Sequence, residues 1–173
     1  RTFVIRQNTS DRIDIHIKRN ERKGVAVNGL PVRKMSEFFG TLTAVIFSPE
    51  DLRLVKGGPA ERRRFMDLEL CQLSRVYCHD LQNYYKVLKQ RNNLLKTSYR
   101  DDSLYDTLDV WDMQLSLYGE KIISARNNFA LKLNDISKNI HSEITDKREE
   151  LAVEYRPNSE EGTLEERIKS HRQ

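Results

Sequence analysis

The chain of 173 residues has few cysteines and no clustered histidines, and these absences exclude several classes of protein. Its two cysteines, Cys71 and Cys78, are seven residues apart, which fits neither a disulfide framework nor a zinc site. We therefore expect reduced thiols. The four histidines are scattered, without the short spacings of a metal centre, so no bound metal is expected.

Long apolar runs and phosphate-binding glycine loops are also missing. No stretch approaches the ~18 apolar residues needed to cross a bilayer, and no signal peptide is present. A cytoplasmic protein without membrane contacts is therefore expected. None of the seven glycines stands in a G-x-x-x-x-G-K-[ST] frame, and no serine or cysteine stands in a nucleophile motif. The residues predict no catalytic centre, and the chain alone is not expected to hydrolyse ATP.

Charge is abundant but unevenly distributed. The net charge is +4, yet residues 1–100 carry 20 Lys and Arg against 10 Asp and Glu, whereas residues 101–173 carry 10 against 16. A basic half favours a polyanionic partner, and an acidic half favours a protein partner or a solvated face. A solvated face alone would also explain both halves.

Residues 1–48 have the two-residue period of an antiparallel sheet. Ile13, Ile15 and Ile17 alternate with polar residues, which predicts a strand with one buried face. Asn28-Gly29 predicts a tight hairpin turn, because both residues tolerate positive φ. The run TLTAVIFSP at residues 41–49 predicts a more buried strand, and Ser36 is expected to cap a short helical turn.

Helical periods dominate from residue 49 onward, and they divide the rest of the chain into three parts. Residues 49–73 predict a first helix that starts at Pro59, a residue suited to the first helical position. Residues 74–146 predict an arm of two long antiparallel helices: one capped by Ser74, and one beginning at Ser103 with an apolar seam over residues 104–144. Residues 147–173 predict a strand at 151–157 and a short helix from Thr163, returning to the sheet.

Three consecutive arginines, Arg62, Arg63 and Arg64, stand near the predicted start of the first helix. A helix N-terminus is already electropositive, so cations there are disfavoured. The placement makes sense if an external phosphate is bound by these arginines together with Lys56, because guanidinium groups bind phosphate in a bidentate way. Pairing with nearby carboxylates, such as that of Asp67, is an equally good explanation from the residues alone.

A weaker basic face is predicted on the first long helix of the arm. It consists of Lys86, Lys89, Arg91 and Lys96, interleaved with Tyr84 and Tyr85. Basic and aromatic residues together can follow a nucleic-acid backbone. The same spacing is also typical of a packed aromatic stripe beside a solvated edge.

The run from Pro49 to Asp67 resembles the signature of the bacterial RecF family. It has an acidic residue after proline, an apolar pair before Lys-Gly, a proline two residues after that glycine, and then Arg-Arg-x-Phe-x-Asp. The signature residues are Pro49, Glu50, Gly57, Pro59, Arg62, Arg63, Phe65 and Asp67. The flanking segments VNGLPV and YYKVLKQRNNLLK also resemble that family, so the resemblance covers most of the chain.

The resemblance implies an α+β fold, with the antiparallel sheet of an SMC/ABC-type ATPase head and a long helical arm. It also implies a recombinational DNA repair and replication protein of the SOS response that dimerises with ATP and Mg²⁺. Such a protein binds DNA at gaps or junctions and helps RecR and RecO to load RecA. The P-loop, the ABC signature and the Walker B region are absent from the 173 residues, and the chain starts at Arg1. We therefore expect an internal part of a RecF protein, without a cofactor of its own.

Two functions follow as alternatives. In the first, Lys56 and the three arginines face DNA or nucleotide phosphate. In the second, the arm binds RecR or another RecF copy and has no direct role in DNA binding.

Overall fold

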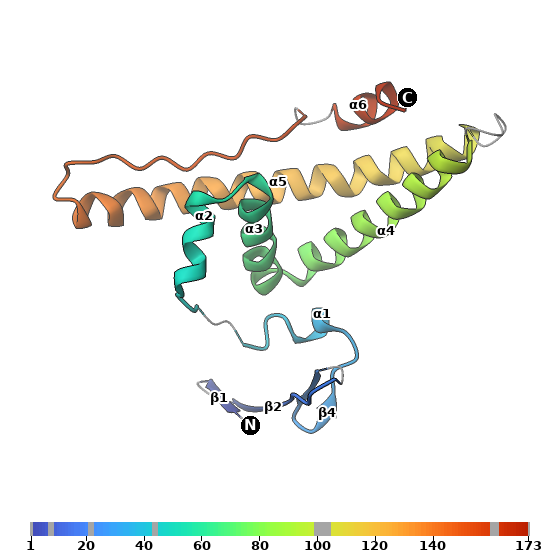
Figure 1. The fold of residues 1–173 in the computed structure, drawn as a ribbon. Helices are drawn as coiled ribbons and strands as arrows, with labels where there is room; N and C mark the ends of the chain where they lie inside the picture. The colour runs from blue at the N-terminus through green and yellow to red at the C-terminus, as the bar shows by residue number, and fades with distance from the viewer. Residues whose placement is uncertain are drawn as a thin grey trace. The chain divides into compact units, whose positions relative to one another are not determined.

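The structure is a computed structural model that describes residues 2–6, 9–20, 23–42, 45–98, 105–159 and 163–172. It divides into two compact units, Arg1–Arg75 and Val76–Gln173. The first unit holds a small sheet and the signature segment, and the second holds the long helices (Figure 1). The α+β class expected from the sequence is confirmed.

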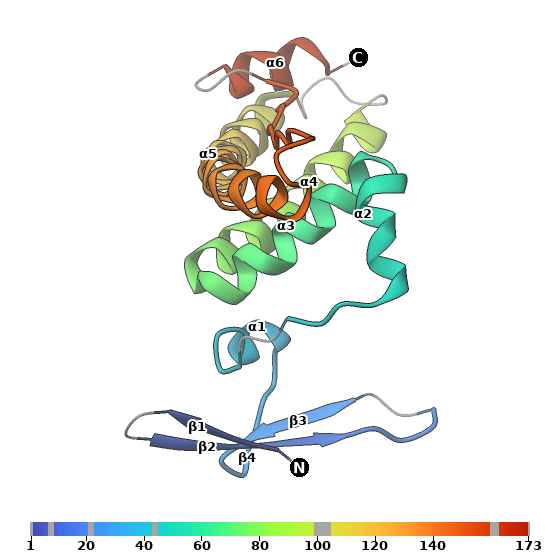
Figure 2. The same ribbon diagram turned by 90° about the vertical axis from the view of Figure 1, so that its left-hand side faces the viewer.

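The sheet of the first unit has four antiparallel strands in chain order, β1 (Thr2–Arg6), β2 (Thr9–His16), β3 (Gly24–Val27) and β4 (Leu30–Pro31) (Figure 2). Asn28 and Gly29 connect β3 and β4 with φ values of 52° and 83°, as the hairpin prediction requires. The Asn28 side chain also accepts a hydrogen bond from Arg12 N at 2.8 Å, which ties the turn to β2.

The buried face predicted for the isoleucines of β2 is largely wrong. Ile13 is only 2% exposed, but Ile15 and Ile17 are 52% and 70% exposed. Ile17 also lies beyond the end of β2. The alternation of apolar and polar residues predicts which side chains share a face of the sheet. It does not show that another part of the protein packs on that face.

The buried strand predicted at residues 41–49 is also wrong in the part that the structure describes. Residues 42 and 45–48 are not in a strand, and residues 43 and 44 lie outside the described residues. Val45, Ile46 and Phe47 are 93%, 82% and 83% exposed. A strand needs a neighbour for its backbone hydrogen bonds, and the described sheet ends at β4. The helical turn before it is α1 (Met35–Phe38), but the side chain of Ser36 is not described.

Three helices follow in the first unit, which confirms the predicted change of period. They are the 3-10 helix η1 (Pro49–Leu52), α2 (Arg53–Lys56) and α3 (Pro59–Leu73). Pro59 is the first residue of α3, as expected.

The second unit contains the two long helices, α4 (Arg75–Ser98) and α5 (Tyr105–Ile144). Side-chain contacts show that they are antiparallel. Tyr77 contacts Arg126 and Asp80 contacts Lys121, whereas Arg91, near the other end of α4, contacts Asp112. The capping residue expected at 103 lies outside the described residues.

The apolar seam of α5 is buried for only part of its length. Leu108, Leu115 and Ile122 are at most 5% exposed, but Ile136, Ile140 and Ile144 are 60%, 52% and 75% exposed. The two helices differ in length, 24 against 40 residues, so α4 is too short to follow the whole seam.

The C-terminal segment runs back along α5, as both ribbon views show (Figures 1 and 2). The strand predicted at residues 151–157 is wrong, because the backbone there is not in a strand. Val153 N donates instead to the side chain of Asn134 at 2.8 Å, and this side-chain contact takes the place of a sheet ladder. The predicted short helix is present as α6 (Leu164–Ser170), and Thr163 is its N-cap. Among the described helices, none is long and apolar enough to cross a membrane.

Candidate nucleic-acid interface

The chain before α3 fixes where the arginines lie. Ser48 precedes η1, and its backbone N–H donates to Asp51 Oδ2 at 2.6 Å, which closes the start of that helix. Gly57 follows α2 in an extended conformation, and a Cβ on it would lie 2.4 Å from the carbonyl oxygen of Arg53. A larger residue at position 57 would therefore displace the backbone between α2 and α3.

Arg62 folds back onto the end of α2. Its Nη1 donates to the carbonyl oxygen of Gly57 at 2.9 Å and to that of Leu54 at 3.4 Å. The last carbonyls of a helix lack helical partners and carry partial negative charge, so a guanidinium is favourable there. Arg62 is thus paired internally, with backbone carbonyls rather than with the carboxylates considered from the sequence.

Arg63 and Arg64 are exposed and differ from Arg62 in their contacts. Within the described part of the chain, neither of them makes a hydrogen bond or an ion pair, and Asp67 is not paired with either. Asp67 is half-buried and has interactions of its own. Two guanidinium groups near the start of α3 are therefore available to an external anion.

Lys56 is exposed and lines an open depression with Pro49, Glu50, Leu52 and Arg53. The pKa of Glu50 is lowered, chiefly by a hydrogen bond with the Ser48 side chain, so its carboxylate is charged at neutral pH. This negative charge beside Lys56 opposes the binding of a phosphate in the depression. Lys56 is thus less well placed for phosphate than Arg63 and Arg64.

The four basic residues predicted to form a face on α4 separate into two groups. Lys86, Lys89 and Lys96 are exposed, whereas Arg91 is 8% exposed. The Arg91 guanidinium pairs with Asp112 of α5 and donates to the carbonyl oxygen of Ile168 at 3.2 Å. Arg91 therefore stabilises the helical unit and does not belong to an exposed basic face, contrary to the prediction.

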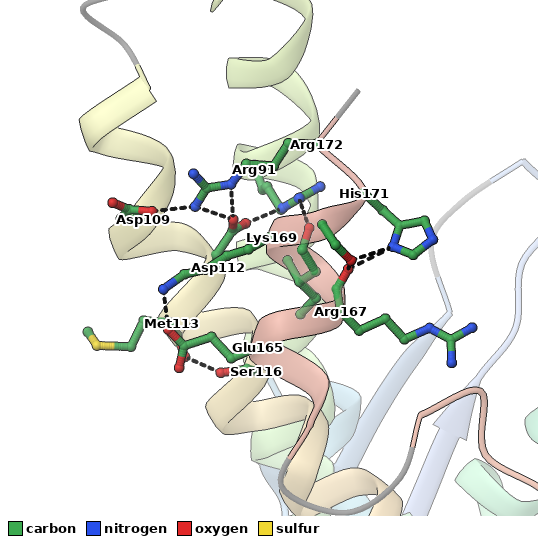
Figure 3. A network of polar contacts seen from close by, with 12 residues as sticks. Arg91, Asp109, Asp112, Met113, Ser116, Glu165, Arg167, Lys169, His171 and Arg172 are labelled. Carbon is green, nitrogen blue, oxygen red and sulfur yellow. Dashed lines mark hydrogen bonds and ion pairs between the residues drawn. The ribbon is translucent and has the colours of Figure 1, made fainter.

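Asp112 is the centre of a polar network that joins α4, α5 and the C-terminal segment (Figure 3). It is fully buried and accepts from Arg91 and, at 2.6 Å, from Arg172. Arg172 also pairs with Asp109, and this bond lowers the pKa of the Asp109 carboxyl. Two cations balance two anions, as a buried charge requires.

The described ranges contain no cluster of side chains suited to a metal ion. Among those residues, no three His, Cys, Asp or Glu side chains gather closely enough to hold a metal ion. Cys71 and Cys78 are both buried free thiols. The arrangement offers exposed cationic groups that can bind an anion.

Comparisons with known proteins point to one family. The DNA replication and repair protein RecF of Agathobacter rectalis is 50% identical over 169 residues, which are 97% of this chain and 46% of that protein. RecF of Lachnoclostridium phytofermentans is 46% identical over 98% of this chain and 47% of its own length. The chain belongs to the RecF family over the length that it covers. It spans about half the length of these RecF relatives.

Solved RecF structures share the fold. The recombination mediator protein RecF-ATP of the RecFOR pathway matches with a TM-score of 0.80 and 30% identity over 94% of this chain and 46% of that one. The RecF-ATPrS structure matches with a TM-score of 0.79 and 32% identity over 95% of this chain and 45% of that one. No family model matches the chain. The family inferred from the signature is thus confirmed.

The sequence alone did not reveal which polar residues of this RecF segment have structural roles. Asp112 directly follows Trp111 of the apolar seam. A carboxylate so close to a buried seam needs a cationic partner, and this position was a signal for a buried ion pair. Arg172, 60 residues away in sequence, had no such signal. Of the signature residues, Gly57, Pro59 and Arg62 shape the junction between α2 and α3.

Proposed function

We propose that this chain is the middle region of a RecF-like recombinational repair protein and that it contacts DNA through Arg63 and Arg64. The observation that supports this most strongly is the difference within the triplet. Arg62 donates to carbonyl oxygens, but Arg63 and Arg64 are exposed and unpaired within the described residues. An unpaired guanidinium group can bind a phosphate through two parallel hydrogen bonds.

The whole protein, on this proposal, binds DNA in an ATP-dependent way through an SMC/ABC-type head. It acts at gaps or junctions with RecR and RecO to load RecA, and it dimerises with ATP and Mg²⁺. Two observations support this role: the relatives are named RecF, and one similar solved structure is named RecF-ATP. Residues for ATP hydrolysis would come from the part of the relatives that this chain does not cover.

The test compares duplex DNA binding of the chain and of its R63Q/R64Q variant, by fluorescence anisotropy at several salt concentrations. Each lost phosphate contact should reduce the slope of log affinity against log salt by about 0.9. We therefore expect a slope smaller by about 2 and a clear loss of affinity. R33Q/K34Q removes two exposed cations from the same unit and is the matched control. An unchanged slope in R63Q/R64Q would contradict the proposal.

A second function, a protein-interaction arm, is favoured by the exposed end of the α5 seam. Ile136, Ile140 and Ile144 follow one another at helical spacing and are each more than half exposed. Such a stripe fits an apolar partner surface, and RecR or another RecF copy is the candidate. Pull-down with RecR should weaken in I140E, while R63Q/R64Q should retain it. Equal retention in both variants would refute this function.

A further inference from the structure

One face of α4 carries lysines that the helical packing does not use. At about 100° per residue, Lys86, Lys89 and Lys96 fall within about 80° of each other around the helix. The rise of 1.5 Å per residue spreads them over about 15 Å along it. All three are exposed. They therefore form one continuous basic stripe, hereafter the α4 lysine face.

Among the described residues, no carboxylate pairs with the α4 lysine face. The one acidic residue of α4 is Asp80, which is 8% exposed and lies 3.9 Å from Lys121 Nζ of α5. Across the described residues, none of the three lysines makes an ion pair or hydrogen bond. Arg91, the fourth cation of this stretch, is buried against Asp112 and adds no charge to the face.

An aromatic ring lies beside this stripe. Tyr85 is 54% exposed and stands one helical turn before Lys89. Its ring is 5.7 Å from that of Tyr84, at an interplanar angle of 76°, so Tyr84 supports it edge to face. Tyr84 is in turn half-buried, because it packs close to Gly119 of α5. The exposed ring is thus held in place and does not collapse onto the helix.

A supported, exposed ring beside unpaired cations fits a single-stranded nucleic acid better than a duplex. Backbone phosphates can follow the lysines while an unpaired base stacks on the ring. In a duplex the bases stack on one another and leave no face for Tyr85. We propose that the α4 lysine face, with Tyr85, binds single-stranded DNA. The inference rests on the proposed DNA-binding function, for which it names a second surface and a strand type.

The experiment measures anisotropy of a labelled 12-nucleotide oligothymidine and of a 12-base-pair duplex over a range of salt. Three lost single-strand contacts should reduce the salt slope by about 2 in K86Q/K89Q/K96Q. Y85A should weaken oligothymidine binding by about tenfold and leave duplex binding and the salt slope unchanged, because stacking carries no charge. Y85F keeps the ring and should bind like the parent chain.

The matched control is K132Q/K147Q/R167Q, which removes three exposed cations elsewhere in the same unit. An equal loss in this control, or no loss in both K86Q/K89Q/K96Q and Y85A, would overturn the inference. R63Q/R64Q measured in parallel separates the two proposals. If only R63Q/R64Q loses binding, the α4 lysine face is refuted and the proposed function stands. If only the lysine variant loses binding, the role of Arg63 and Arg64 is refuted.

Discussion

Arg62 shows how one residue of a charged cluster acquires a structural role. Its guanidinium reaches Gly57 and Leu54, both within eight positions, whereas Arg63 and Arg64 point elsewhere around the helix. The local cause is the Gly57 turn, which exposes the last carbonyls of α2 to α3. The triplet is therefore one clamp and two exposed cations.

Replacing Arg62 by Gln should destabilise the chain by about 1 kcal/mol, the usual net value of an intramolecular hydrogen bond. The reason is the loss of the charged contacts with the two carbonyls at the end of α2. Urea denaturation followed by circular dichroism measures this change. R63Q removes the same charge one residue away and should shift the free energy of unfolding by less than about 0.5 kcal/mol. Equal destabilisation by both variants would show that Arg62 is not a clamp.

Sequence patterns predicted the elements that depend on local residues. The Asn28-Gly29 turn, Pro59 at the start of α3 and the long α5 all follow from backbone preference or helical period. The strands predicted at 41–49 and 151–157 depended on neighbours, and periodicity does not provide a neighbour. Arg91 was placed on a basic face for the same reason, since its partner Asp112 is 21 residues away.

At the scale of elements, α5 is the helix on which the second unit is built. Glu120 Oε1 accepts from Leu164 N at 3.2 Å, and Asn134 accepts from Val153 N, so one helix holds both the extended segment and α6. Gly119 of α5 lies beside Tyr84 of α4 and Leu164 of α6. A Cβ at position 119 would stand 2.4 Å from Leu164 Cδ2 and 3.5 Å from the Tyr84 ring.

Gly119→Ala should loosen α6 without unfolding α5. Alanine favours the helical backbone by about 1 kcal/mol over glycine, which strengthens α5. Its methyl group would displace Leu164, the first residue of α6. Hydrogen exchange should therefore become faster in residues 164–170 and stay slow in α5. G119A/L164A removes the clash between the new methyl group and Leu164, but it also removes the contacts of the leucine side chain. L164A alone measures the effect of losing those contacts and is therefore the control. Unchanged exchange in α6 of G119A would contradict the prediction.

At the scale of the whole second unit, the C-terminal segment is held to α5 by ion pairs near both ends of that helix. Lys138 Nζ lies 2.7 Å from Glu150 Oε1, and Arg172 pairs with Asp109. Hydrogen bonds with Lys138 and with Arg172 lower the pKa of Glu150 and of Asp109, respectively. Both carboxylates are exposed to solvent, so each pair alone contributes little.

These pKa shifts predict that acid weakens the attachment of the segment at both ends. A carboxyl whose pKa is lower in the folded state stabilises that state above its unfolded pKa, near 4, and this stability is lost as pH falls through the folded value. Exchange protection of residues 149–172, corrected for intrinsic rates, should therefore hold from pH 7 to about 5 and decrease below about 4. In K138M/R172M both pairs are absent, so protection should be lower at pH 7 and depend less on pH. An equally steep acid transition in this variant would show that other carboxylates control the attachment.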